Sequence, residues 1–244
     1  MITYNPDSKI FYSTLINDDR FISGFSTKDL GDARTLQTLQ AFFQGQGLPV
    51  KTIIELEQIH STNIETVSNT KEQLMNLPDA DGSITNLSNA ALIVKNADCV
   101  PIVYVDKIAG YIGISHNGWR GSLKRLAPKM IQKMVSLGSK IEHITCALGP
   151  AIGLCCYEVD EDFYYEFMGE FEIYAKQIFQ FRKGRWHVNL TLLNCLLLRE
   201  AGVKKVNIDF FPFCTKCDQK RFFSRRRAKH EDFERMFNFI VKFK

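Results

Sequence analysis

The sequence lacks the features that mark a membrane or a secreted protein. No apolar run approaches the roughly 20 residues that cross a bilayer, and residues 1–6 carry neither the basic nor the apolar segment of a secretion signal. The cysteines are odd in number, seven, and their spacing suggests no disulfide framework. Reduced thiols are typical of a cytosol. We therefore expect a cytoplasmic protein that has no membrane partner.

Internal repeats, low-complexity tracts and Gly/Ser linkers are also missing. With 244 residues, of which 45% are apolar and 24% charged, the composition is that of a soluble globular protein with a proper core. The net charge is only +4, but basic residues crowd one stretch in which Asp218 is the only acid: Lys216, Lys220, Arg221, Arg225, Arg226, Arg227 and Lys229. This basic stretch is compatible with a solvated face, with an RNA-binding surface on which Phe222 and Phe223 stack bases, or with a site for free phosphate.

Hydrophobic periodicity predicts both helices and strands. The clearest helix covers residues 189–200, with Asn189 as its cap, leucines on one face and Gly202 as its end. Residues 32–43 and 122–137 also predict helices, although Pro128 requires the second to kink or to begin late. Short β-branched runs predict strands at 52–56, 91–94, 102–105, 111–114, 145–148 and 206–211. Because the two patterns mix without strict alternation, we expect an α+β fold, with mixed β-sheets and helices packed outside.

Three residues follow the predicted strands and offer soft-metal ligands: His60, Cys99 and His116. Cys99 follows His60 by 39 residues and precedes His116 by 17, so no local zinc-finger motif is involved. Ligands at strand ends can converge on one rim of a sheet, and three protein ligands leave the fourth position of a tetrahedral zinc open. A thiolate beside one imidazole would instead suit a cysteine nucleophile in a hydrolase, so that alternative stays open.

Two further cysteines form a Cys-x-x-Cys pair, Cys214 and Cys217. A structural zinc site needs a second pair of ligands, and none lies nearby in the sequence at suitable spacing. Cys155 and Cys156 are adjacent residues, which cannot easily chelate one ion. The sequence therefore predicts no second metal site.

A series of short sequence motifs resembles those of a known family. In order they are Gln-Ile-His at 58–60, Asp-Ala-Asp-Gly at 79–82, Ala-Asp-Cys-Val-Pro at 97–101, His-Asn-Gly-Trp-Arg-Gly at 116–121, Leu-Gly-Pro-Ala-Ile-Gly at 148–153, Cys-Cys-Tyr-Glu-Val at 155–159, Cys-Thr at 214–215 and Phe-Phe-Ser at 222–224. The chain closely resembles the YfiH family, formerly called multicopper polyphenol oxidoreductases or laccases and now regarded as purine nucleoside phosphorylases. The resemblance runs from about residue 21 to about residue 240 and implies a single YfiH-like catalytic domain over 1–244, as a monomer or homodimer.

The resemblance also implies a cofactor and substrates. Zinc would be bound by His60, Cys99 and His116, and the substrates would be adenosine, inosine and S-methyl-5′-thioadenosine with inorganic phosphate. Adenosine deamination would be a side activity, and no nucleic-acid partner is expected. Asp98 is a candidate proton shuttle or a group that supports the neighbouring Cys99, and Arg120 is a candidate catalytic group. Arg120, Arg226 and Gln58 are candidate ligands of substrate or phosphate.

The chain departs from the family pattern at three places. Lys28 replaces an arginine and the loop after it is shortened, which keeps the charge but loses the bidentate fork. The motif Ser-Arg-Arg-Arg at 224–227, which includes Arg225, and the motif Phe-Glu-Arg that begins at Phe233 also differ from the family pattern. Copper remains an alternative to zinc, because two histidines and a cysteine are the ligands of a blue-copper site. A complete multicopper set does not fit, since the chain has five histidines in total.

Overall fold

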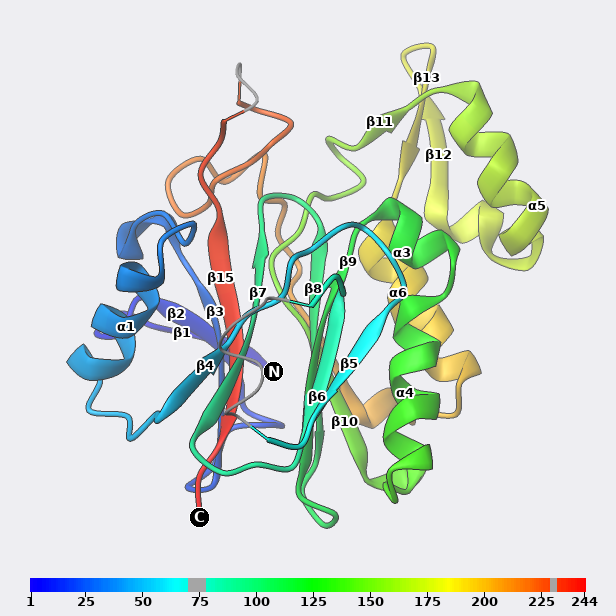
Figure 1. The fold of residues 1–244 in the computed structure, drawn as a ribbon. Helices are drawn as coiled ribbons and strands as arrows, with labels where there is room; N and C mark the ends of the chain where they lie inside the picture. The colour runs from blue at the N-terminus through cyan, green and yellow to red at the C-terminus, as the bar shows by residue number, and fades with distance from the viewer. Residues whose placement is uncertain (70–77, 229–231) are drawn as a thin grey trace.

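The computed structural model of the protein describes residues 1–69, 78–228 and 232–244. Two six-stranded sheets lie face to face in the middle of the molecule (Figure 1). The first has the order β1-β2-β3-β15-β7-β4, with bounds Ile2–Asn5, Ile10–Ser13, Phe21–Ser26, Met236–Lys242, Ala90–Asn96 and Thr52–Ile54. Its strands are antiparallel except for the β4–β7 pair.

The second sheet has the order β14-β10-β8-β9-β6-β5. The bounds are Ile208–Phe210, Ile144–Leu148, Val100–Asp106, Tyr111–Asn117, Gly82–Thr85 and Ile64–Val67. The β10–β14 and β5–β6 pairs are parallel and the others antiparallel. A small third sheet joins β11, β13 and β12, at Glu158–Val159, Arg185–Val188 and Phe179–Arg182.

Helices cover the outer faces of the two large sheets (Figure 1). Helix α1 (Leu36–Gly45) packs on the first sheet, and α3 (Trp119–Leu123), α4 (Leu126–Ser136) and α6 (Leu190–Glu200) pack on the second. Helix α5 (Glu161–Ile178) lies with the small sheet in a lobe beside them. Short 3₁₀ turns occupy Lys28–Leu30, Ile141–His143 and Lys205–Asn207. The mixed sheets with outer helices confirm the predicted α+β class.

The core has a layer on each side of each sheet. Between the sheets, residues such as Leu92, Val103 and Ile114 are fully buried. Other apolar clusters fill the space under α1 and under α4 and α6. Strand β8 is buried along its whole length because both its faces are covered, which explains its continuous apolar run. Among the described residues, no helix has both the length and the apolar character needed to cross a bilayer.

Local sequence signals account for several boundaries. The side chain of Asn189 accepts a hydrogen bond from the Leu192 N–H and caps α6 as predicted. Pro128 is the third residue of α4, where its missing N–H has no partner in any case, so the predicted helix at 122–137 begins late and does not kink. Strands β7, β8 and β9 extend past the predicted ranges by one to three residues at one or both ends.

Candidate metal centre

The three predicted ligands come together at one place. One ligand atom from each of His60, Cys99 and His116 lies within 4.8 Å of those of the other two. The two imidazole rings are 4.9 Å apart between centroids and cross at 77°, so they do not stack. His116 is buried, with 4% exposure, whereas His60 is exposed.

Strand ends position two of these ligands. Cys99 lies in the turn between β7 and β8, and His116 is the next-to-last residue of β9, paired with Pro101. The prediction that each ligand lies at a strand end is wrong for His60, which follows the end of β4 at Ile54 by six residues. A loop carries His60 instead, because Gln58 and a bridge between Glu57 and Asp79 hold that loop in place.

The backbone around the ligands is unusually tight. His60 and Asp98 have positive φ angles of 58° and 96°, a backbone conformation that residues other than glycine rarely adopt. Gly118 lies against the ligands: a Cβ there would be 2.8 Å from His60 Cδ2 and 3.2 Å from Cys99 Sγ. Only glycine at 118 therefore leaves room for these side chains to converge.

A buried carboxylate, Asp81, holds both histidines. Its Oδ1 lies 2.9 Å from His116 Nδ1 and accepts the His60 N–H at 3.1 Å. The other oxygen accepts the N–H and the hydroxyl of Ser61. With Nδ1 engaged, His116 offers Nε2 to a metal, which is the usual arrangement behind a metal-bound imidazole. Asp81 was not a predicted site residue. The only feature of the sequence that points to it is the Asp-Ala-Asp-Gly motif at 79–82.

The negative charge of a Cys99 thiolate and the positive charge of a protonated His116 stabilise each other. Burial raises the pKa of Cys99, but the charge of His116 and hydrogen bonds from both imidazoles outweigh it and lower that pKa to about 6. Burial lowers the pKa of His116, and the Cys99 thiolate together with Asp81 raises it to about 9. The two shifts describe a thiolate beside an imidazolium, and a metal ion that binds both residues would take the place of the imidazolium proton.

The donor set fits a soft metal ion. Two imidazole nitrogens and one thiolate are ligands of both zinc and copper. The close approach at Gly118 and the carboxylate behind His116 are the features such a centre needs. The described residues can therefore bind a metal here, in a three-ligand set that leaves a coordination position open.

Two other predicted site residues are already hydrogen-bonded within the protein. Asp98 accepts the hydroxyls of Thr215 (2.6 Å) and Ser224 (2.9 Å) and the N–H of Arg226 (2.7 Å). Gln58 pairs its amide with the N–H and C=O of Lys95 at 2.7 and 2.8 Å. Asp98 thus joins the Cys99 turn to residues 215–226, and Gln58 joins the His60 loop to β7.

The predicted arginines lie near the aromatic walls of the site. Arg120 lies over the Trp119 ring at 4.2 Å, and Arg226 lies over the Tyr157 ring at 5.3 Å. A cavity of about 130 Å³ is bounded by Cys99, Asp98, Trp119, Tyr157 and Arg226 among others. A groove of about 530 Å³ shares Trp119, Tyr157 and Arg226 with it.

One of the two rings proposed to stack RNA bases is not accessible. Phe222 is fully buried and packs against Phe11 and Phe211, so it cannot stack on a base, whereas Phe223 is half-buried. Arg227 donates to the carbonyls of Thr215, Lys216 and Phe222 and is structural. Lys229 lies outside the described residues.

The fold brings to Cys214 and Cys217 a second pair of possible ligands that spacing in the sequence did not indicate. Cys155 and Cys156 lie against them, and the four sulfur atoms are all within 4.8 Å of one another. A larger cavity of about 830 Å³ borders this cluster and α6, away from His60 and His116.

Fold and site together define an α+β protein in which three possible soft-metal ligands converge beside paired sheets. The chain belongs to the YfiH family: the family described as "Multi-copper polyphenol oxidoreductase laccase" matches residues 20–242. It is 31% identical over 226 residues to purine nucleoside phosphorylase RP494 of Rickettsia prowazekii, which covers 91% of this chain and 89% of that protein. It is also 31% identical over 203 residues to adenosine deaminase RL5 of an unknown prokaryotic organism, covering 80% of this chain and 76% of that one. The crystal structure of YlmD from Geobacillus stearothermophilus superposes with a TM-score of 0.86 at 25% identity, over 100% of this chain and 99% of that one.

Proposed function

We propose that this protein is a zinc-dependent purine nucleoside phosphorylase. It acts on adenosine, inosine and S-methyl-5′-thioadenosine with inorganic phosphate, and deaminates adenosine as a side activity. The observation that carries the proposal is that Cys99, one of three converging soft ligands, also lines a cavity with aromatic and cationic walls. The names of the relatives RP494 and RL5 support the same assignment.

The metal ligands would be His60, Cys99 and His116. Zinc in such a site supplies a Lewis acid with one open coordination position. Asp81 fixes the orientation of the His116 imidazole and the position of the His60 backbone, so these parts of the site are held before a metal arrives. Such preorganisation lowers the cost of binding because little has to move.

Phosphate would be bound by Arg226, which lines the cavity, and by Arg120, which lies over the cavity residue Trp119. A guanidinium presents two parallel N–H groups that match a phosphate. The backbone of Arg226 is fixed by its hydrogen bond to Asp98, while its side chain lies over Tyr157. Arg120 contributes a second positive charge from the start of α3. The pair would orient phosphate for attack on the anomeric carbon of the ribose.

The purine base would lie in the groove beside Tyr157. Trp119, Tyr157 and Phe163 line a groove of about 530 Å³, a size that suits a nucleoside. Stacking on aromatic rings binds purines with little dependence on their substituents, which agrees with activity on several nucleosides.

Asp98 would act as a positioning residue. Its two oxygens accept three hydrogen bonds, so its carboxylate connects Cys99 to the segment that carries Arg226. Asp98 would affect the reaction by holding Cys99 and Arg226 in place, without contacting the substrate.

Products distinguish the two proposed activities. Zinc-loaded protein incubated with adenosine should form adenine only when phosphate is present, and inosine without it. Inosine as substrate should give hypoxanthine in a phosphate-dependent manner. If neither adenine nor inosine forms from adenosine, the assignment is wrong.

A cysteine hydrolase is the second candidate, favoured by one specific observation. Cys99, His116 and Asp81 form a series of thiol, imidazole and carboxylate, the arrangement of a nucleophile, its base and the group that orients the base. The metal content of Cys99→Ala separates the candidates: full occupancy with activity lost would identify a nucleophile.

A copper-dependent polyphenol oxidase is less compatible with the site. The part of the chain that the structure describes contains no imidazole-rich second cluster for three further copper ions. A single copper could still compete for the His60, Cys99 and His116 ligands because of its higher intrinsic affinity. Polyphenol oxidation that follows copper loading and disappears with zinc would support this alternative.

A further inference from the structure

Two turns far apart in the sequence lie side by side at one edge of the second sheet. Strands β10 and β14 are parallel neighbours, and the segments after their carboxyl ends run on together. Ala151 forms a parallel bridge with Cys214 and accepts the Thr215 N–H at 3.0 Å. Each segment then turns: the Gly153 carbonyl accepts the Cys156 N–H, and the Cys214 carbonyl accepts the Asp218 N–H. Four cysteines, at 155, 156, 214 and 217, are brought together by this pairing.

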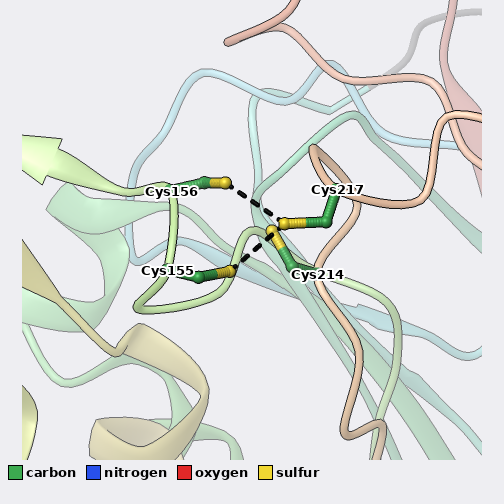
Figure 2. A group of neighbouring side chains, drawn as sticks. All are labelled: Cys155, Cys156, Cys214 and Cys217. Carbon is green, nitrogen blue, oxygen red and sulfur yellow. Dashed lines mark hydrogen bonds between the residues drawn. The ribbon is translucent and has the colours of Figure 1, made fainter.

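The four side chains point toward a common centre (Figure 2). Cys217 Sγ lies 3.5 Å from Cys155 Sγ and 3.4 Å from Cys156 Sγ, and all four sulfurs are within 4.8 Å of one another. A disulfide needs about 2.05 Å, and all four residues are free thiols. Four sulfurs at about 2.3 Å from a tetrahedral zinc lie about 3.8 Å apart. The observed spacing is close to that of four sulfurs around one metal ion.

The surroundings of Cys214 Sγ favour a charged ligand. The backbone N–H groups of Gly153, Lys216 and Cys217 form hydrogen bonds with this sulfur, and hydrogen bonds of this kind stabilise a thiolate.

Arginines fix both turns from outside. Arg182 donates to the carbonyls of Leu154 (3.1 Å) and Cys155. Arg227 donates to the carbonyls of Thr215 (3.1 Å) and Lys216 (2.9 Å). A site of four thiolates and one dication carries two net negative charges, and a guanidinium on each turn compensates them. Gly153 allows the close approach, since a Cβ there would be 3.1 Å from Cys214 Cβ.

We propose that Cys155, Cys156, Cys214 and Cys217 form a second, closed metal site, which binds zinc through four thiolates and has a structural role. Binding replaces thiol protons by one dication and needs no oxidant. The site joins residues that reach the first centre: Tyr157 follows Cys156 and lines the cavity at Cys99, and Thr215 follows Cys214 and donates to Asp98. A metal here would hold both walls in place.

Metal analysis of the reduced, full-length protein tests the proposal. The wild type should contain two zinc ions per chain, and Cys99→Ala and the double variant Cys156→Ser/Cys217→Ser should each contain one. Cys195→Ser, which changes a partly buried cysteine outside both clusters, should keep two. Wild-type metal content in the double variant would overturn the proposal.

Cobalt provides an independent signature. In cobalt-loaded protein, thiolate-to-metal charge-transfer absorption grows with the number of coordinated sulfurs. Cys99→Ala should keep about four fifths of the wild-type absorption, the share of four thiolates among five, and the double variant should keep about one fifth. Absorption that disappears entirely in Cys99→Ala would mean that the four cysteines bind no metal.

A measurement on the unmodified chain covers the case in which the variants do not fold. A mercurial thiol reagent added to reduced wild-type protein should release two zinc ions, detected with a zinc-binding dye. Release of one ion, or a mass corresponding to a disulfide in the reduced protein, would contradict a four-thiolate site.

Discussion

The two sulfur-containing clusters of this protein differ in donors, in support and in access. His60, Cys99 and His116 provide three ligands, backed by the buried carboxylate of Asp81 and joined to a cavity lined by Trp119, Tyr157 and Arg226. The second cluster provides four sulfurs from two turns, backed by backbone N–H groups and guanidinium-bound carbonyls.

Under the two proposals, the first cluster has a catalytic role and the second a structural role. Three ligands beside a cavity would leave a metal position where a substrate can approach, whereas four sulfurs would complete a tetrahedron. In the first centre, His116 lies in β9 and pairs with Pro101 of β8, and Cys99 directly precedes β8, so a buried sheet holds the geometry of both residues. Turns alone hold geometry poorly, and there a metal contributes most to stability.

The largest effect is expected from Cys99→Ala. Removal of the thiolate deletes a ligand and its negative charge, so the first centre should lose its metal and the nucleoside activity should disappear. His60→Ala should retain more metal, because it removes a neutral, exposed ligand, and Cys99→Ser should rescue little, since a hydroxyl is a poor ligand at neutral pH. Metal content and activity of the three variants check this order. Equal metal retention in Cys99→Ala and His60→Ala would contradict it.

Asp81→Asn should give the next largest effect. The amide preserves the shape but holds His116 and the His60 backbone less firmly, and loss of such a supporting carboxylate lowers metal affinity by roughly 10- to 100-fold. Competition with a zinc chelator measures the affinity. Asp209→Asn is a suitable control, because that carboxylate contacts Ser13 and the N-terminus, away from both clusters. Unchanged affinity in Asp81→Asn would show that the carboxylate is not needed.

A matched pair of glycine substitutions compares the two clusters directly. Gly118→Ala places a Cβ 2.8 Å from His60 Cδ2, and Gly153→Ala places one 3.1 Å from Cys214 Cβ. The first should weaken metal binding and activity by about tenfold while the melting temperature changes little; the second should lower the melting temperature, by about 2–4 °C for a loss of 1 kcal/mol in a chain of this size. Calorimetry and activity assays on both proteins measure the two outcomes. If both substitutions affected the same property, the division of roles would be wrong.

The smallest effect is expected from Arg120→Gln. This arginine is exposed, so its charge is partly screened, and its loss should raise KM for phosphate by about threefold, less than the full worth of one charge-assisted hydrogen bond. Lys124→Gln, the same charge change just after α3, serves as the control and should leave KM unchanged. A steady-state phosphate titration of both variants decides between them; equal effects would indicate a general field and no direct contact.

The sequence predicted what is decided locally. Helix α6 has its cap, its leucine face and its terminating glycine within a dozen residues, and β7 to β9 are marked by β-branched runs. Cys99 and His116 could be found because each lies at the edge of such a strand. The pairing of the strands was not predictable in this way: no local signal places β15 between β3 and β7.

Contacts between distant segments account for what was missed. Asp81 is 21 residues from His60 and 35 from His116, so its link to both appears only in the folded chain. Likewise, Cys156 and Cys214 are 58 residues apart in the sequence. The parallel pairing of β10 with β14, which no spacing rule anticipates, brings them into contact.

The position of β15 has a consequence for the order of folding. This strand, the last in the chain order of the described elements, fills the gap between β3 and β7, which come from much earlier in the sequence. A growing chain interrupted before Met236 would therefore present two unpaired strand edges, the kind of surface that promotes aggregation. The first sheet closes only when its final strand arrives, so pulse-labelled refolding should show amide protection in β3, β7 and β15 developing in a single phase.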